Sequence, residues 1–168
     1  MSTKIIFLDI DNVLNDKNSA SKCEFIEKRT VITGIDNSKV KKLHKICSET
    51  GAILVLISSW RYFWERYNKD HEYSIANYLN RKLKKYGLRI YDKIPDEIPD
   101  TKRGEGIKQW LKKNFTPEEK PKWIILDDEF ATEYLEQKIS SHLVRINAET
   151  GLTDDRVEVA IQKLNEED

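Results

Sequence analysis

The sequence contains little cysteine, and the cysteines it has follow no metal-binding pattern. Of the 168 residues only Cys23 and Cys47 are cysteines, and neither belongs to a CxxC pair or has histidine at zinc-finger spacing. Small domains that depend on disulfides or structural zinc carry more cysteine in recognisable patterns. The sequence therefore predicts a fold that needs no such crosslink, in a reducing compartment.

An excess of charge of one sign is also absent. The chain has 29 Lys and Arg residues against 29 Asp and Glu residues, so its net charge is zero although 35% of its residues are charged. This balance argues against a polybasic protein that coats nucleic acid and against an acidic tail protein. Apolar residues make up 39% of the chain, which at this length predicts a single domain, residues 1–168, with a well-buried core.

Long hydrophobic runs are missing as well. The apolar stretch at residues 5–8 ends at Asp9, whereas a membrane-spanning helix needs about 20 apolar residues and the core of a signal peptide at least about 7. We therefore expect a cytoplasmic protein with no membrane partner.

Short apolar runs predict strands that are buried on both faces. They are rich in β-branched residues and too short for helices, which is typical of the strands of a parallel sheet. The runs are residues 5–8, 52–57, 123–126 and 143–146, and residues 88–91 are a further candidate.

The segments between these runs have the apolar spacing of helices. A helix is predicted from a cap at residues 36–38 to Gly51, and others at residues 62–86, 105–113, 130–138 and 155–164. Strands that alternate with helices predict an α/β fold, a doubly wound, Rossmann-like parallel sheet of about five strands. Residues 15–34 interrupt the alternation, and we interpret them as a short flap or hairpin insertion in which residues 23–26 pair with residues 29–32.

Polar and acidic side chains follow three of the predicted strands. Asp9 and Asp11 follow the first run, Ser58 the second, and Asp127 and Asp128 the third. The carboxyl ends of parallel strands meet at one edge of the sheet, where ligands of such folds bind. A single aspartate there is equally typical of a turn or a helix cap. Four aspartates brought together repel one another unless cations or protons neutralise them, and Mg²⁺, which prefers oxygen ligands, is the simplest candidate.

The residues around these positions resemble the four motifs of the haloacid dehalogenase (HAD) superfamily of phosphotransferases. Residues 7–14, with an Asp-Ile-Asp sequence directly after an apolar strand, are similar to the first motif, and Ser58 to the second. Lys102 or Arg103, at the head of a predicted helix, resembles the third motif, and the Ile-Leu-Asp-Asp sequence of residues 125–128 resembles the fourth. The resemblance implies a HAD-like fold.

A narrower resemblance is to the HAD domain of Swiss-army-knife RNA repair proteins. The segments that carry it are residues 58–61, 103–111, 125–128 and 151–153. One position departs from the superfamily pattern, because the residue after the second aspartate of the first motif is usually glycine and here is Asn12. Asparagine is the non-glycine residue that best tolerates a left-handed backbone, so we expect the turn to survive.

The resemblance implies a Mg²⁺-dependent phosphohydrolase, a phosphatase that works through an aspartyl-phosphate. Asp9 is then the residue that attacks phosphorus, and Asp11 protonates the leaving oxygen and later takes a proton from water. Ser58 and Arg103 contact the phosphoryl oxygens. The implied catalytic residues are Asp9, Asp11, Ser58 and Arg103, and the implied metal ligands are Asp9, Asp11, Asp127 and Asp128.

Several details of this site stay open. Lys102 is an alternative to Arg103 as the cation of the third motif, and either Asp127 or Asp128 is the direct metal ligand. Asp11 is expected to bind the metal through its backbone carbonyl. Because the first and fourth motifs share the metal, residues 5–8 are predicted to form the central strand, between residues 52–57 and residues 123–126.

The substrate is expected to be a phosphorylated nucleic-acid end or a nucleotide. Members of the superfamily gain substrate selectivity from cap insertions, so the resemblance together with the short insertion implies minimal or no cap. An open site suits a macromolecular phosphate or an oligomer that supplies the lid. Trp60 and Arg61 follow the second motif, where a base could stack on the indole and a phosphate could bind the guanidinium. A phosphorylated small molecule is the alternative substrate, and a non-catalytic HAD-fold binding or scaffold module is the alternative function. The sequence does not determine the oligomeric state.

Neighbouring aromatic and basic residues have simpler interpretations. Phe63, Trp64 and Tyr67 are predicted to pack on the sheet. The basic residues between positions 81 and 89 are predicted to form a solvated face.

Overall fold

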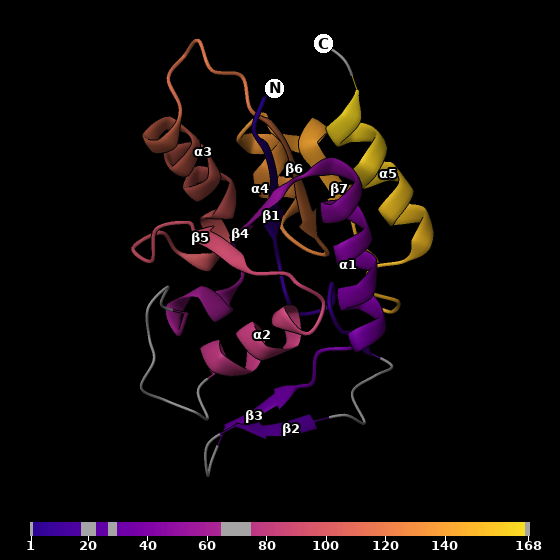
Figure 1. The fold of residues 1–168 in the computed structure, drawn as a ribbon. Coiled ribbons are helices and arrows are strands. Elements are labelled where there is room, and N and C mark those ends of the chain that lie inside the picture. The colour runs from indigo at the N-terminus through magenta and orange to yellow at the C-terminus, as the bar shows by residue number, and fades with distance from the viewer. Residues whose placement is uncertain (1, 18–22, 27–29, 65–74, 167–168) are drawn as a thin grey trace.

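A five-stranded parallel sheet forms the centre of the computed structural model, which describes residues 2–17, 23–26, 30–64 and 75–166 (Figure 1). β1 (Lys4–Leu8) lies in the middle, between β4 (Ile53–Leu56) and β6 (Lys122–Asp127). β5 (Ile90–Lys93) and β7 (Leu143–Arg145) form the two edges. The predicted order of the three central strands is confirmed.

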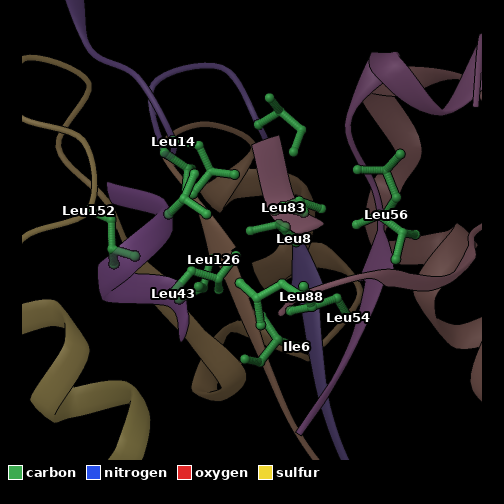
Figure 2. Close-up of a cluster of buried hydrophobic side chains, with 14 of the residues drawn as sticks. Ile6, Leu8, Leu14, Leu43, Leu54, Leu56, Leu83, Leu88, Leu126 and Leu152 are labelled. Carbon is green, nitrogen blue, oxygen red and sulfur yellow. The ribbon is translucent and has the colours of Figure 1, made fainter. Parts of the chain in front are cut away.

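Helices cover both faces of the sheet. α1 (Asn37–Thr50), α2 (Ile75–Lys84) and α5 (Asp154–Asn165) contribute to one buried cluster, and α3 (Arg103–Asn114) and α4 (Ala131–Glu136) to the other. Successive residues of a strand point to opposite faces; accordingly Ile6 and Leu8 belong to the first cluster, shown in Figure 2, and Ile5 and Phe7 to the second. This arrangement confirms the doubly wound α/β fold.

The ends of α1 follow the signals in the sequence. The side chain of Asp36 accepts a hydrogen bond from the N–H of Ser38 at 2.8 Å, which caps the first turn. Gly51 has a φ of 72° and ends the helix in the left-handed conformation that glycine adopts without strain.

The helix predicted over residues 62–86 is not continuous. A 3-10 helix, η2 (Ser59–Tyr62), follows β4, residues 63 and 64 are not helical, and α2 is described over Ile75–Lys84. In the tighter turn Phe63 lies on the solvent side and is 59% exposed, so the prediction that it packs on the sheet is wrong, whereas Trp64 is buried as predicted. Residues 65–74, which include Tyr67, lie outside the described residues.

Two short 3-10 helices and one shifted strand complete the order of elements. The 3-10 helices are η3 (Asp100–Lys102), before α3, and η4 (Ser140–His142), before β7. β5 begins two residues later than predicted because the N–H of Leu88 donates to the carbonyl of Leu83 at 3.1 Å and so still belongs to the end of α2.

The insertion after β1 contains the predicted hairpin. β2 (Cys23–Ile26) pairs antiparallel with β3 (Thr30–Thr33), beyond the carboxyl ends of the central strands in Figure 1, and Arg29 lies outside the described residues. The two ends of the insertion meet, because the N–H of Asp36 donates to the carbonyl of Leu14 at 2.8 Å. The buried Lys39 ammonium lies 2.7 Å from Asp16 and 3.2 Å from Asp36, which strengthens this junction.

Candidate active site

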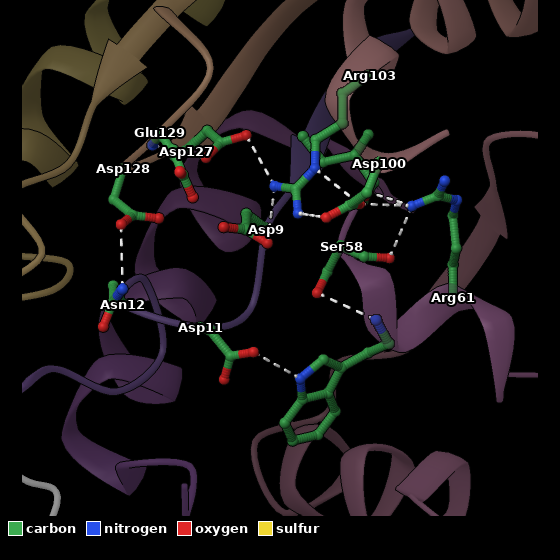
Figure 3. Close-up of polar contacts among 12 residues, drawn as sticks. Asp9, Asp11, Asn12, Ser58, Arg61, Asp100, Arg103, Asp127, Asp128 and Glu129 are labelled. Atoms are coloured by element: carbon green, nitrogen blue, oxygen red, sulfur yellow. Dashed lines mark hydrogen bonds and ion pairs between the residues drawn. The ribbon is translucent and has the colours of Figure 1, made fainter. Parts of the chain in front are cut away.

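Three aspartates meet at the carboxyl edge of the sheet (Figure 3). The N–H of Asp9 donates to the carbonyl of Leu126 at 3.0 Å, which continues the pairing of β1 with β6 past the end of β1. Asp9 therefore lies beside Asp127 and Asp128, and one carboxylate oxygen from each lies within 4.8 Å of the others. The structure brings together three of the four aspartates predicted as metal ligands.

The environment of these aspartates disfavours their charged forms. Asp9 and Asp127 are buried, and Asp128 is half-buried. Burial raises the pKa of Asp9 well above its ordinary value, and the neighbouring Asp127 charge raises it further. Burial also raises the pKa of Asp127. Oxygen ligands this close together form the kind of site that a hard divalent cation stabilises.

The Arg103 guanidinium provides the positive charge beside these carboxylates. Its Nη1 lies 3.1 Å from Asp9 and 3.0 Å from Asp127, and its Nε and Nη2 donate to Asp100 at 3.1 and 2.9 Å. The ring of Phe130 lies 4.5 Å from the guanidinium carbon and covers it. Lys102, the alternative cation, has a 61% exposed side chain that lies 3.8 Å from Glu105.

The start of α3 is fixed by a residue of α4. Glu133 accepts hydrogen bonds from the N–H groups of Gly104 and Glu105 at 2.7 and 3.3 Å, as a carboxylate does at the positive end of a helix. A Cβ added at Gly104 would lie 2.6 Å from Glu133 Oε2, so a larger residue there would displace the Glu133 carboxylate. These contacts hold the helix that carries Arg103 against the helix that follows Asp127.

Asp127 has two further partners that the sequence analysis did not identify. The Tyr134 hydroxyl donates to Asp127 Oδ2 at 2.6 Å, and the N–H of Glu129 donates to Oδ1 at 2.9 Å. Tyr134 lies one turn into α4 and is fully buried. In the sequence, Tyr134 is recognisable only as a residue of the helix predicted after the fourth motif. That position does not show whether a tyrosine packs in the core or hydrogen-bonds to a carboxylate.

Asn12 occupies the position at which the superfamily usually has glycine. Its φ is 60°, so the expected left-handed turn is present. Its N–H donates to Asn15 at 2.7 Å, and its side-chain amide donates to Asp128 at 3.1 Å. Asparagine therefore both permits the turn and connects the first motif to the fourth.

The comparison with protein families agrees with this geometry. Residues 5–157 match the family described as the HAD domain in Swiss Army Knife RNA repair proteins. The chain belongs to this family. No curated protein and no solved structure matches the chain. Membership indicates a phosphohydrolase, as the resemblance of the four motifs implies.

Asp11 of this HAD domain is held apart from the other three aspartates. Its Oδ2 accepts a hydrogen bond from the Trp60 indole N–H at 3.0 Å, and its Oδ1 from the Asn15 amide at 3.3 Å. Its carboxylate is not part of the group formed by Asp9, Asp127 and Asp128. The prediction that Asp11 binds a metal through its backbone carbonyl remains a prediction.

Ser58 lies at the end of β4, as the second motif of a HAD domain requires. It is buried, and its Oγ accepts a hydrogen bond from the N–H of Trp60 at 3.3 Å. The serine therefore caps η2 and at the same time faces the edge of the sheet that carries Asp9 (Figure 3).

Burial contradicts the predicted contacts of Trp60 and Arg61 with a substrate. Trp60 is only 6% exposed and packs against Tyr78, with 6.3 Å between ring centroids. Arg61 is fully buried, and it donates to Asp100 at 2.9 Å and to the carbonyl of Ile98 at 2.6 Å. A base therefore cannot stack on the buried Trp60 indole. The Arg61 guanidinium is already hydrogen-bonded to the segment that precedes α3.

Two remaining predictions concern the surface and the membrane. Arg81, Lys84, Lys85 and Arg89 are exposed and Lys82 is half-buried, as predicted for a solvated face. In the described part of the chain, no helix has the length and apolar character needed to cross a bilayer.

Proposed function

We propose that this HAD domain hydrolyses phosphate monoesters with the help of Mg²⁺ and through a phosphorylated Asp9. The observation that carries the proposal is the position of Asp9 at the end of the central strand, within 4.8 Å of Asp127 and Asp128 and 3.1 Å from Arg103. In this setting Asp9 can share a metal ion with Asp127 and Asp128, and the Arg103 charge beside it can bind the oxygens of a phosphoryl group.

The residues present fit a magnesium ion. Asp9, Asp127 and Asp128 offer the hard oxygen ligands that Mg²⁺ prefers. Burial raises the pKa of both Asp9 and Asp127, and a bound cation would favour their charged forms. These three side chains, with the backbone carbonyl of Asp11, would hold the ion. When bound, Mg²⁺ reduces the repulsion between the phosphoryl oxygens and the nucleophile.

The reaction uses Asp9 and Asp11 in turn. A carboxylate oxygen of Asp9 forms a bond to phosphorus while the bond from phosphorus to the ester oxygen breaks, and Asp11 donates a proton to that leaving oxygen. Asp11, now ionised, takes a proton from water as the water oxygen attacks phosphorus. The bond between Asp9 and phosphorus then breaks, and inorganic phosphate leaves.

Ser58 and Arg103 act on the transferred group. The Ser58 hydroxyl accepts the N–H of Trp60, and since a hydroxyl also donates one hydrogen bond, its hydrogen is available to a phosphoryl oxygen. Arg103 lies against the nucleophile before substrate binds. In the transition state its charge is shared with the phosphoryl oxygens.

The test uses a generic substrate. Protein stripped with EDTA is expected to hydrolyse p-nitrophenyl phosphate only after Mg²⁺ is restored. Turnover that EDTA does not affect would contradict the role of the metal.

For the substrate we propose a phosphorylated nucleic-acid end or a nucleotide. The family description, which names RNA repair proteins, supports this choice over a sugar phosphate. The zero net charge of the chain suits a short end better than a long polynucleotide, which proteins usually bind through an extended basic surface. A phosphorylated oligonucleotide is expected to have a higher kcat/KM than a sugar phosphate, and the reverse order would favour a small-metabolite phosphatase.

Replacing Arg103 by lysine is expected to lower kcat/KM by about 10²–10³-fold, the usual cost of losing one electrostatic contact in a transition state. A single ammonium cannot reproduce the contacts of the guanidinium with Asp9, Asp127 and Asp100. Lys102→Ala is the matched control, since its exposed ammonium lies near Glu105 and is expected to leave kcat/KM unchanged. Near-normal kcat/KM in Arg103→Lys together with a loss in Lys102→Ala would show that net charge, and not this geometry, determines the rate.

A further inference from the structure

We propose that Trp60 is a positioning residue that orients the Asp11 carboxyl for proton transfer. The inference rests on the proposed function and extends it to a residue with no assigned role. Trp60 follows the serine of the second motif and reaches the first motif through its indole nitrogen, 3.0 Å from Asp11 Oδ2. A buried indole N–H needs an acceptor, and here the acceptor is the side chain assigned to general acid and base catalysis.

The indole is held firmly enough to orient another group. Its backbone N–H is bonded to Ser58, and its ring packs against Tyr78. The Tyr78 hydroxyl in turn accepts the N–H of Ile35 at 2.8 Å. Trp60 is therefore fixed by β4, by α2 and by the chain that returns from the insertion. A donor that cannot move restricts the rotation of the carboxylate it contacts.

A second contact holds Asp11 from the other side. The Asn15 amide donates to Asp11 Oδ1 at 3.3 Å, while Asn15 Oδ1 accepts the N–H of Asn12 at 2.7 Å. Because that backbone N–H can only donate, it identifies the oxygen and the nitrogen of the Asn15 amide. The two contacts keep the Asp11 carboxyl away from the cluster of Asp9, Asp127 and Asp128.

The indole also limits where the Asp11 carboxyl can carry its proton. An indole N–H donates and never accepts, so the lone pair of Asp11 Oδ2 that faces Trp60 cannot bear a proton. Asp11 Oδ1 accepts a longer contact, 3.3 Å from the Asn15 amide. Trp60 thus restricts the directions in which the Asp11 carboxyl can present its proton to the leaving oxygen.

The test compares two substrates that differ in how much they need a general acid. Benzyl phosphate releases a basic alkoxide and requires the proton, whereas p-nitrophenyl phosphate releases a stabilised phenolate and does not. Trp60→Phe removes the N–H and keeps an aromatic ring. We expect kcat/KM for benzyl phosphate to fall by at least about tenfold, a part of the 10²–10⁴-fold that general acid catalysis supplies, and kcat/KM for p-nitrophenyl phosphate to change little. kcat/KM is the chosen quantity because later hydrolysis of phosphorylated Asp9 does not affect it.

Trp64→Phe is the matched control. Trp64 is also buried, and its indole donates to Asn80 at 3.1 Å, with no contact to Asp11. This variant loses the same kind of hydrogen bond and is expected to leave the ratio of the two kcat/KM values unchanged. Melting temperatures of both variants, measured together, separate a loss of folded protein from a loss of proton transfer.

A double-mutant cycle completes the test. In an Asp11→Asn background the general acid is gone, so adding Trp60→Phe is expected to cause no further loss with benzyl phosphate. Equal losses on both substrates, or additive losses in the cycle, would overturn the positioning role and leave Trp60 a core residue. If wild-type protein hydrolyses neither substrate in a manner that depends on Asp9, the proposed function fails, and this inference fails with it.

Discussion

The Asp9→Asn variant is expected to lose phosphate-ester hydrolysis, with kcat reduced by at least about 10⁴-fold, because removal of the nucleophile in covalent catalysis eliminates the main reaction path. An amide is a poor nucleophile and contributes no charge to a metal. The replacement is nearly isosteric at a position that is 4% exposed, so the surrounding residues need not move. The measurement is steady-state hydrolysis of p-nitrophenyl phosphate with saturating Mg²⁺.

Thermal melting in EDTA separates this loss from unfolding. Burial and the Asp127 charge raise the pKa of Asp9 in the folded protein, so the folded state binds this proton more tightly than the unfolded state does. The free energy of unfolding therefore falls as the pH rises from the unfolded pKa to the folded pKa, so an aspartic acid at this position costs the metal-free protein stability at neutral pH. Asp9→Asn removes this cost and is expected to melt no lower than wild type. Near-normal turnover by a folded Asp9→Asn variant would contradict the mechanism.

The largest expected effect on stability belongs to Asp100→Asn. Asp100 Oδ1 lies 2.9 Å from Nη1 of Arg61, and its Oδ2 lies 2.9 Å from Nη2 of Arg103. Removing the charge leaves the fully buried Arg61 without a carboxylate, and such losses typically cost about 3–5 kcal/mol. At roughly 2–4 °C per kcal/mol for a protein of this size, the melting temperature is expected to fall by about 10 °C.

Asp96→Asn is the control for this prediction. Asp96 lies in the segment between β5 and η3, 2.7 Å from Lys93, but its side chain is 44% exposed, and such surface pairs contribute about 0–1 kcal/mol. The pH dependence provides a second check. Burial raises the pKa of Asp100, but hydrogen bonds from Arg103 and Arg61 outweigh it, and the pKa is lowered. The stability that Asp100 contributes is therefore present above the unfolded pKa, about 3.9, and the difference between wild type and Asp100→Asn should shrink as the pH falls below that value.

The sequence predicted those parts of the site that follow buried strands. Apolar runs locate β1, β4 and β6, and the strand ends then put Asp9, Ser58 and Asp127 at one edge, because parallel strands share an orientation. The family motifs added Arg103 as one of two candidates. Only the packed structure distinguishes it from Lys102, because the two side chains leave adjacent positions in different directions.

The contacts that support the site were not predictable in the same way. The sequence predicts substrate contacts for Trp60 and Arg61 because aromatic and basic residues near a motif commonly bind nucleic acid. In the structure Trp60 instead donates to Asp11 and Arg61 to Asp100, two carboxylates that are distant in sequence. Such pairings depend on which loops fold back onto the sheet, and no local periodicity encodes them. The predicted start of a helix at residue 62 fails for a similar reason. Residues 59–62 form a short 3-10 turn that is capped by Ser58, and helix propensity does not reveal such a turn.

The hydrogen bond between Leu14 and Asp36 makes the insertion a segment whose length can change at little cost in stability. The chain departs from the core after Leu14 and rejoins it at Asp36, whose N–H lies 2.8 Å from the departing carbonyl. When the two ends of a loop are held together, each doubling of its length costs only about 0.6 kcal/mol in closure entropy. Asp9 and Asp11 precede the junction, and the second, third and fourth motifs follow it. A change in the length of this one segment is therefore expected to leave the positions of Asp9, Ser58 and Arg103 relative to one another unchanged.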